Sequence, residues 1–133
     1  MVSGSAVLVG GDPGIGKSTL LLQFLMGVSR NGQQSLYVSG EESASQIRMR
    51  ADRLGGPPEN LQVLTEIDVD RIIEVLDQLA PRAAVIDSIQ TIVSPDISGA
   101  SGTVSQVREV AARLIHWAKA NQVPLFLVGH VTK

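Results

Sequence analysis

The sequence predicts an α/β fold in which a parallel sheet is covered by helices on both faces. Short apolar runs alternate along the chain with longer segments of helical periodicity, the pattern of repeated strand–helix units. The apolar runs are nearly continuous rather than alternating, as strands buried on both faces require. With 133 residues, the chain has the size of one domain, spanning 1–133. Ligands of such sheets bind at the carboxyl ends of the strands, so the residues that follow each strand are the candidates for a site.

Five strands and four helices are expected, in alternating order. The predicted strands are 6–9, 35–38, 61–64, 83–86 and 125–128. The predicted helices are 17–30, 43–54, 68–79 and 103–121. Ser43 and Gln46 form a capping box at the start of the second helix, and Asn31-Gly32 ends the first.

Three of the helices carry apolar stripes that are expected to face the sheet. In the first, the stripe is Leu20, Leu21, Phe24, Leu25 and Val28. In the third, it is Val69, Ile72, Ile73, Leu76 and Leu79. In the last, it is Val104, Val107, Val110, Ala111, Leu114, Ile115 and Ala118. The long loop 94–102 between the fourth strand and the last helix is small and polar, a composition that predicts mobility.

The composition excludes several classes of protein. With 11 Lys and Arg against 13 Asp and Glu, the net charge is −2, which excludes a strongly basic nucleic-acid-binding protein. The absence of cysteine excludes disulfides, thiolate nucleophiles and cysteine-based zinc sites. No apolar run reaches the roughly 20 residues that span a bilayer, so we expect a cytoplasmic protein without a membrane partner.

A phosphate-binding loop follows the first predicted strand. Residues 11–18 read Gly-Asp-Pro-Gly-Ile-Gly-Lys-Ser, which fits the pattern of glycine, four residues and then Gly-Lys-Ser. Such a loop turns successive backbone N–H groups toward anionic oxygens, and the following helix adds the positive end of its dipole. The predicted nucleotide-binding residues are Gly11, Asp12, Pro13, Gly14, Ile15, Gly16, Lys17, Ser18 and Thr19. The alternative is a glycine-rich turn without a ligand.

Polar residues at three other predicted strand ends complete the candidate site. Asp87 follows the fourth strand and, with the Ser18 hydroxyl, is predicted to hold Mg²⁺; the alternative is a turn cap. Glu41 follows the second strand and could polarise an attacking water; the alternative is that Glu41 and Glu42 only stabilise the start of the next helix. His130 follows the fifth strand, where it could contact the γ-phosphate or lie in a surface loop.

Three arginines form a basic cluster on the second predicted helix. Arg48, Arg50 and Arg53 could form ion pairs with Asp52 or Glu42 on a solvated face. Alternatively, one of them could lie against an adenine ring through a cation–π contact.

Beyond these patterns, the sequence resembles the bacterial RadA (Sms) family of ATPases. The resemblance runs essentially end to end and is carried by five segments, which are 10–23, 37–43, 85–91, 104–109 and 128–133. It implies a three-layer RecA-like ATPase core, related to the RecA and DnaB ATPases, with the strand order 3-2-4-5-1.

The same resemblance implies roles and partners. Glu41 would be the catalytic carboxylate, Asp87 the Mg²⁺-side aspartate, His130 the nucleotide sensor, and 88–102 the first DNA-facing loop. Lys17 would act in catalysis as well as in binding. The implied cofactors are ATP or ADP and Mg²⁺. The implied whole-protein function is an ATP-driven motor for branch migration in DNA recombination and repair, assembled as a hexameric ring on single-stranded or branched DNA.

Three features of the RadA pattern have no counterpart in the sequence: the four-cysteine zinc module, the Lys-Asn-Arg-Phe-Gly motif and the protease-like domain. We therefore expect an excised or designed minimal core with weak or no turnover in isolation. The alternative is a minimal phosphate-loop domain that binds nucleotide without motor activity. In such a core the first strand is an exposed edge, which favours association of two chains or poor solubility.

Overall fold

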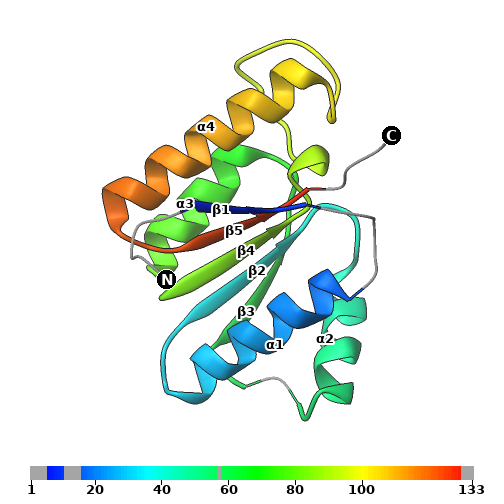
Figure 1. The fold of residues 1–133 in the computed structure, drawn as a ribbon, viewed down its shortest axis with the longest axis vertical. Coiled ribbons are helices and arrows are strands. Elements are labelled where there is room, and N and C mark those ends of the chain that lie inside the picture. Colours follow the sequence, from blue (N-terminus) through cyan, green and yellow to red (C-terminus); the bar gives the residue numbers. More distant parts are fainter. Residues whose placement is uncertain (1–5, 11–15, 57, 130–133) are drawn as a thin grey trace.

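The computed structural model describes residues 6–10, 16–56 and 58–129, and its centre is a five-stranded parallel sheet (Figure 1). The strands are β1 (Ala6–Val9), β2 (Ser35–Ser39), β3 (Leu61–Thr65), β4 (Ala83–Asp87) and β5 (Leu125–Val128). Their spatial order is β1-β5-β4-β2-β3. This is the predicted 3-2-4-5-1 order seen from the other edge, so the prediction is confirmed.

Helices cover both faces of the sheet and give three layers (Figure 1). One face carries α1 (Lys17–Arg30) and α2 (Ala44–Arg53), and the other carries α3 (Val69–Leu79) and α4 (Val104–Asn121). These bounds, like those of the strands, agree with the predicted ones to within a residue. None of the helices within the described residues is long and apolar enough to cross a membrane.

Parallel pairing brings the carboxyl ends of the strands to one edge. β1 pairs with β5 so that Val9 lies beside Val128, and β4 pairs with β5 so that Asp87 also lies beside Val128. On the other side of β4, Asp87 lies beside Ser39 at the end of β2. The residues after four strands are therefore neighbours in space.

Two apolar clusters hold the layers together. The cluster under α3 and α4 includes Ile72, Leu76, Leu114 and Ile86. The cluster under α1 and α2 includes Leu22, Leu25, Met26, Tyr37, Ile47 and Val85. The central strands β2, β4 and β5 are buried along their whole length, which accounts for their continuous apolar sequences.

The predicted apolar stripe of α1 is only partly confirmed: Leu25 is buried and Leu21 packs against the core, whereas Leu20 and Phe24 are exposed. The residues that face the sheet are Leu22, Leu25, Met26 and Ser29. Leu20 is 66% exposed and Phe24 is 40% exposed. The helix carries apolar residues on nearly all sides, so its periodicity does not define one face, and packing against β2 and β4 selects it.

The first turn of α4 also differs from the prediction. Val104, placed on the inward face, is 69% exposed, whereas Gln106 is 1% exposed. The Gln106 Nε2 donates toward the carbonyls of the preceding loop, and its Oε1 accepts from Ser94 N at 2.8 Å. The loop carbonyls within reach of this amide are those of Ser94, Ile97, Ser98 and Gly99, at 3.1–3.4 Å.

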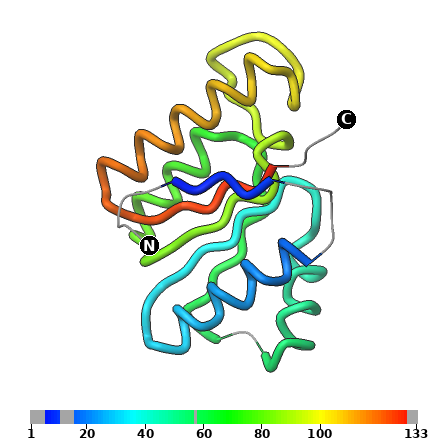
Figure 2. Tube along the Cα trace, in the orientation of Figure 1, coloured from blue at the N-terminus to red at the C-terminus, as the bar shows by residue number. Residues whose placement is uncertain are grey.

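The loop 94–102 therefore encloses a buried side chain, although its composition predicts mobility. It follows the short 3₁₀ helix η1 (Ile89–Thr91) and lies over the start of α4, where Figure 2 shows it in yellow. A backbone hydrogen bond holds the residue just before the loop, where Val93 N donates to Ile67 O at 2.7 Å.

β1 forms one edge of the described sheet, as predicted. It pairs with β5 alone among the described strands. Val7 is 37% exposed and Leu8 is 68% exposed, and no other described strand pairs with the outer edge of β1. Whether two chains associate through it stays a prediction.

Candidate functional site

Six of the predicted site residues lie within the described part of the chain. They are Gly16, Lys17, Ser18, Thr19, Glu41 and Asp87. The phosphate-loop residues Gly11, Asp12, Pro13, Gly14 and Ile15, and the predicted sensor His130, lie outside the described residues. The site is therefore built from the start of α1 and the ends of β2 and β4.

Gly16 begins the helix that follows the phosphate loop. Its φ is 76° and its ψ is −22°, a left-handed conformation that glycine adopts without steric cost. A Cβ at this position would meet nothing within 4 Å, so backbone conformation rather than space requires the glycine. No side chain caps the helix here, which leaves its first N–H groups available to an anion.

Lys17 has a buried ammonium group with no counter-ion among the residues that the structure describes. Its Nζ is buried, and no hydrogen-bond partner for it lies among the described residues. Burying a charge without a partner is costly in a protein interior. A phosphate group at the loop would provide the missing acceptor, so Lys17 fits the predicted ligand.

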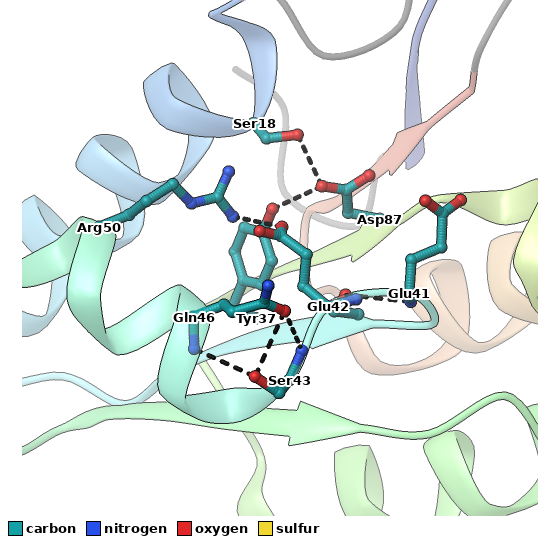
Figure 3. A network of polar contacts seen from close by, with 9 residues as sticks. Ser18, Tyr37, Glu41, Glu42, Ser43, Gln46, Arg50 and Asp87 are labelled. Carbon is teal, nitrogen blue, oxygen red and sulfur yellow. Dashed lines mark hydrogen bonds and ion pairs between the residues drawn. The ribbon is translucent and has the colours of Figure 1, made fainter.

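Ser18, Tyr37 and Asp87 form a hydrogen-bonded network at the strand ends (Figure 3). The Ser18 hydroxyl and the Tyr37 phenol both donate to Asp87 Oδ2, each at 2.6 Å. Asp87 is 9% exposed and Tyr37 is fully buried. Burial, reinforced by the adjacent Asp87 charge, raises the pKa of the Tyr37 phenol well above its usual range. The phenol therefore remains a donor, and the pair Ser18–Asp87 has the oxygen ligands that Mg²⁺ prefers.

The end of β2 is fixed against β4 by backbone contacts. Gly40 N donates to Asp87 O at 3.1 Å. A Cβ on Gly40 would lie 2.0 Å from Thr91 Oγ1 and 2.7 Å from Thr91 Cβ, so only glycine allows this approach. The Asp87–Ser88 peptide bond is cis. Together these contacts place the residues after β2 beside Asp87.

Glu41 and Glu42 leave β2 in different environments. The Ser39 Oγ accepts from the Glu41 and Glu42 backbone N–H groups, at 3.3 and 2.9 Å. The Glu42 carboxylate pairs with Arg50 at 2.7 Å. The Glu41 side chain is exposed and has no hydrogen bond or ion pair with any other described residue. In Figure 3 its carboxylate points toward the same side as that of Asp87.

The structure places the three arginines of α2 in the environments that the solvated, ion-paired interpretation describes. Arg50 forms the expected ion pair with Glu42, and its Nε is buried without a partner among the described residues. Arg48 and Arg53 are exposed. Whether an arginine contacts a nucleotide base stays a prediction.

Sequence reasoning assigned two residues of this site no role in nucleotide or metal binding, although the RadA resemblance placed Ser88 in the DNA-facing loop 88–102. Tyr37 was counted only as part of an apolar strand, although a hydroxyl in a strand buried on both faces needs a partner. It is the single tyrosine of the chain, which is a signal that could have drawn attention to it. Ser88 follows Asp87, is 1% exposed, and its Oγ has no partner among the described residues. Nothing in the sequence pattern distinguishes Ser88.

The start of α1 thus carries a buried ammonium and one of a pair of oxygen ligands, the other oxygen ligand ends β4, and an exposed carboxylate follows β2. This arrangement can bind a phosphate anion with a divalent cation and position a water next to it. The chemistry agrees with the expectation from the loop sequence.

Comparison with known proteins gives independent evidence about the family of the chain. The family model described as "AAA domain" matches residues 1–133. The chain is 52% identical over 133 residues to the DNA repair protein RadA of Bacillus subtilis and 53% identical to that of Streptococcus pneumoniae. In both cases the match includes the whole chain but only 29% and 31% of the relative. The chain therefore spans less than a third of the length of these curated relatives.

The fold has a counterpart among solved structures. A KaiC-like protein from the hyperthermophilic archaeon Pyrococcus horikoshii OT3 superimposes with a TM-score of 0.77, over 97% of this chain and 62% of that one. Its sequence is 24% identical, so the likeness concerns the fold, and it bears out the predicted RecA-like class. The chain belongs to the AAA domain family, and its resemblance to the RadA family is confirmed over its whole length.

Proposed function

We propose that the chain binds ATP with Mg²⁺ and hydrolyses it slowly, as the ATPase core of a RadA-type DNA repair protein. The observation that carries the proposal is the Lys17 ammonium, which is buried without an acceptor among the described residues, next to the Ser18–Asp87 pair. A triphosphate would provide the acceptor and bring the cation. The names of the curated relatives support the role in DNA repair.

The binding step uses the loop and the start of α1. The backbone N–H groups of residues 11–19, except that proline at position 13 has none, would surround the phosphate oxygens, and Lys17 would donate to the β- and γ-phosphates. Ser18 and Asp87 would hold Mg²⁺, which when bound neutralises charge on those phosphates. Ser18 can keep its hydrogen bond to Asp87 while its oxygen lone pair faces the cation.

The hydrolytic step needs a carboxylate beside the γ-phosphate. Glu41 would accept a hydrogen bond from the attacking water and take up its proton as the water attacks in line. Glu42 does not suit this role because its carboxylate is held by Arg50. His130, after β5, would contact the γ-phosphate and respond to its loss.

Slow turnover is expected for a chemical reason. Transition-state charge on the γ-phosphoryl group is commonly stabilised by a cation from a neighbouring subunit, worth about 10³–10⁵ in rate. In the proposed hexamer such a cation would come from the next copy. Single-stranded or branched DNA would contact residues 88–102. With a net charge of −2, binding of DNA by the chain alone should be weak and should fall with added salt.

The proposal is tested by calorimetric titration with Mg-ATP beside a turnover assay, with and without single-stranded DNA. We expect binding, and slow release of phosphate that DNA or a high protein concentration increases. Binding without any phosphate release would favour the alternative, a domain that binds nucleotide without hydrolysing it. No binding would refute both.

A Glu41→Gln variant separates the two steps. We expect turnover to fall about 100-fold or more, the usual contribution of a general base, while Mg-ATP affinity stays unchanged. The matched control is Glu59→Gln, which removes an exposed carboxylate just before the amino end of β3, away from the carboxyl ends of the strands, and should change neither quantity. Unchanged turnover in Glu41→Gln would remove Glu41 from the mechanism.

A further inference from the structure

We propose that Tyr37 is a positioning residue that orients the Asp87 carboxylate for the divalent cation. The inference rests on the proposed function, because it concerns the same Mg²⁺ site. It assigns a task to a buried side chain whose hydroxyl donates to Asp87.

The geometry limits the freedom of the Asp87 carboxylate. A carboxylate at a strand end can rotate about its side-chain torsions unless its oxygens are held. Here two hydroxyls from different elements donate to one oxygen, Oδ2. One is Ser18 of α1 and the other is Tyr37 of β2. No hydrogen bond from another described residue reaches Oδ1, which leaves that oxygen open to a cation or its bound water.

Of the two donors, Tyr37 is the fixed one. Its ring is fully buried in the cluster under α1 and α2, and its strand pairs with β4, so that Tyr37 lies beside Val85. Ser18 lies at the start of α1, next to the loop that binds phosphate, and its hydroxyl is also the predicted cation ligand. The strand-borne phenol can therefore hold Asp87 in place before the cation arrives.

Partners that orient a metal ligand typically contribute about 10- to 100-fold to metal affinity. Removing only the phenolic oxygen should therefore weaken Mg²⁺ binding without changing the pocket for phosphate. This separation is what a purely structural role of Tyr37 does not predict.

The first test is Tyr37→Phe, which deletes the hydroxyl and keeps the ring. Mg²⁺ is titrated by calorimetry into protein saturated with ADP, and ADP affinity is measured separately in EDTA. We expect Mg²⁺ affinity to fall about 10-fold and ADP affinity in EDTA to stay unchanged. Equal loss of both, or of neither, would overturn the proposal.

Ser35→Ala is the matched control. It removes a buried hydroxyl of the same strand, which lies 2.5 Å from Ser29 Oγ and donates to Leu25 O at 3.2 Å, at the opposite end of β2 from the site. It should lower stability and leave Mg²⁺ affinity unchanged. A loss of Mg²⁺ affinity in this variant equal to that of Tyr37→Phe would attribute the effect to weakened packing and overturn the proposal.

A second measurement uses the wild-type sequence, in case the variant does not fold. Tyr37 is the single tyrosine, so incorporation of 3-fluorotyrosine gives one ¹⁹F resonance. We expect it to shift when Mg²⁺ is added to ADP-saturated protein, and not when Mg²⁺ is added without nucleotide. An unmoved resonance, in protein whose Mg²⁺ binding is seen by calorimetry, would refute the role of Tyr37 alone. Absence of any Mg²⁺ and ADP binding would refute the proposed function.

Discussion

Lys17 and Gln106 both bury polar atoms, yet only Gln106 has them satisfied within the described residues. The Gln106 amide is enclosed by the carbonyls and an N–H of the loop 94–102. The Lys17 Nζ has no partner among the described residues. The Gln106 amide is thus hydrogen-bonded within the described residues, whereas the Lys17 ammonium is not. Both residues lie next to segments that the sequence predicts to be loops.

The difference indicates where a ligand is needed. A buried polar group that is fully hydrogen-bonded contributes to stability, whereas one without a partner lowers it. The buried Lys17 ammonium therefore lacks an acceptor among the described residues, and we propose that a phosphate provides it. In the Gln106 loop the buried amide itself has its partners among the described residues, although the Ser94 Oγ of the same loop has none.

The largest effect is expected from a substitution at Lys17, whose ammonium has no partner among the described residues. Lys17→Ala should reduce Mg-ATP affinity about 100-fold, since a hydrogen bond from a charged group is worth about 1.5–3 kcal/mol. The melting temperature without nucleotide should stay the same or rise, because an unpartnered buried charge is removed. Lys119→Ala, an exposed lysine in the last turn of α4, is the control. Calorimetry and thermal unfolding give both quantities, and unaltered affinity would show that the site is misassigned.

The next largest effect is expected from a substitution at Gln106, whose amide is hydrogen-bonded to the loop 94–102. Gln106→Ala should lower the free energy of unfolding by about 2 kcal/mol, because it removes the buried amide that hydrogen-bonds to the backbone N–H and carbonyl of the buried Ser94. Nucleotide affinity should not change. Denaturant unfolding measures the loss, and Gln78→Ala, an exposed glutamine on α3, should have almost no effect. A stability equal to that of the wild type would show that the loop does not depend on Gln106.

The smallest effect concerns the ion pair beside the site. Glu42→Gln removes the ion pair with Arg50. The side chain of Glu42 is 34% exposed and that of Arg50 is 23% exposed. Pairs this exposed are worth about 0.2–1 kcal/mol, and high salt should remove most of that difference. Unfolding at low and high salt tests this. A large loss of turnover in Glu42→Gln would instead move the catalytic role away from Glu41.

Much of the fold could be predicted because its signals are local. Strand β4 and helix α3 have apolar patterns with one interpretation, and the capping box of Ser43 and Gln46 is present as predicted. The stripe of α1 could not be predicted in the same way, because Leu20 and Leu22 are equally apolar and only the sheet distinguishes them. Gln106 was missed because its partners lie in a loop with no pattern of its own.

The sequence alone determined the order of elements, the phosphate loop and the placement of Asp87 and Glu41 at strand ends, since spacing and chemical type are properties of the chain itself. The tertiary structure decided which hydroxyls meet Asp87, that Arg50 holds Glu42 and leaves Glu41 exposed, and that Gln106 holds a loop. These contacts join residues that are distant in sequence or that could pair with any of several partners. Only the packing of sheet against helices fixes such choices, because burial penalises every polar atom left without a partner.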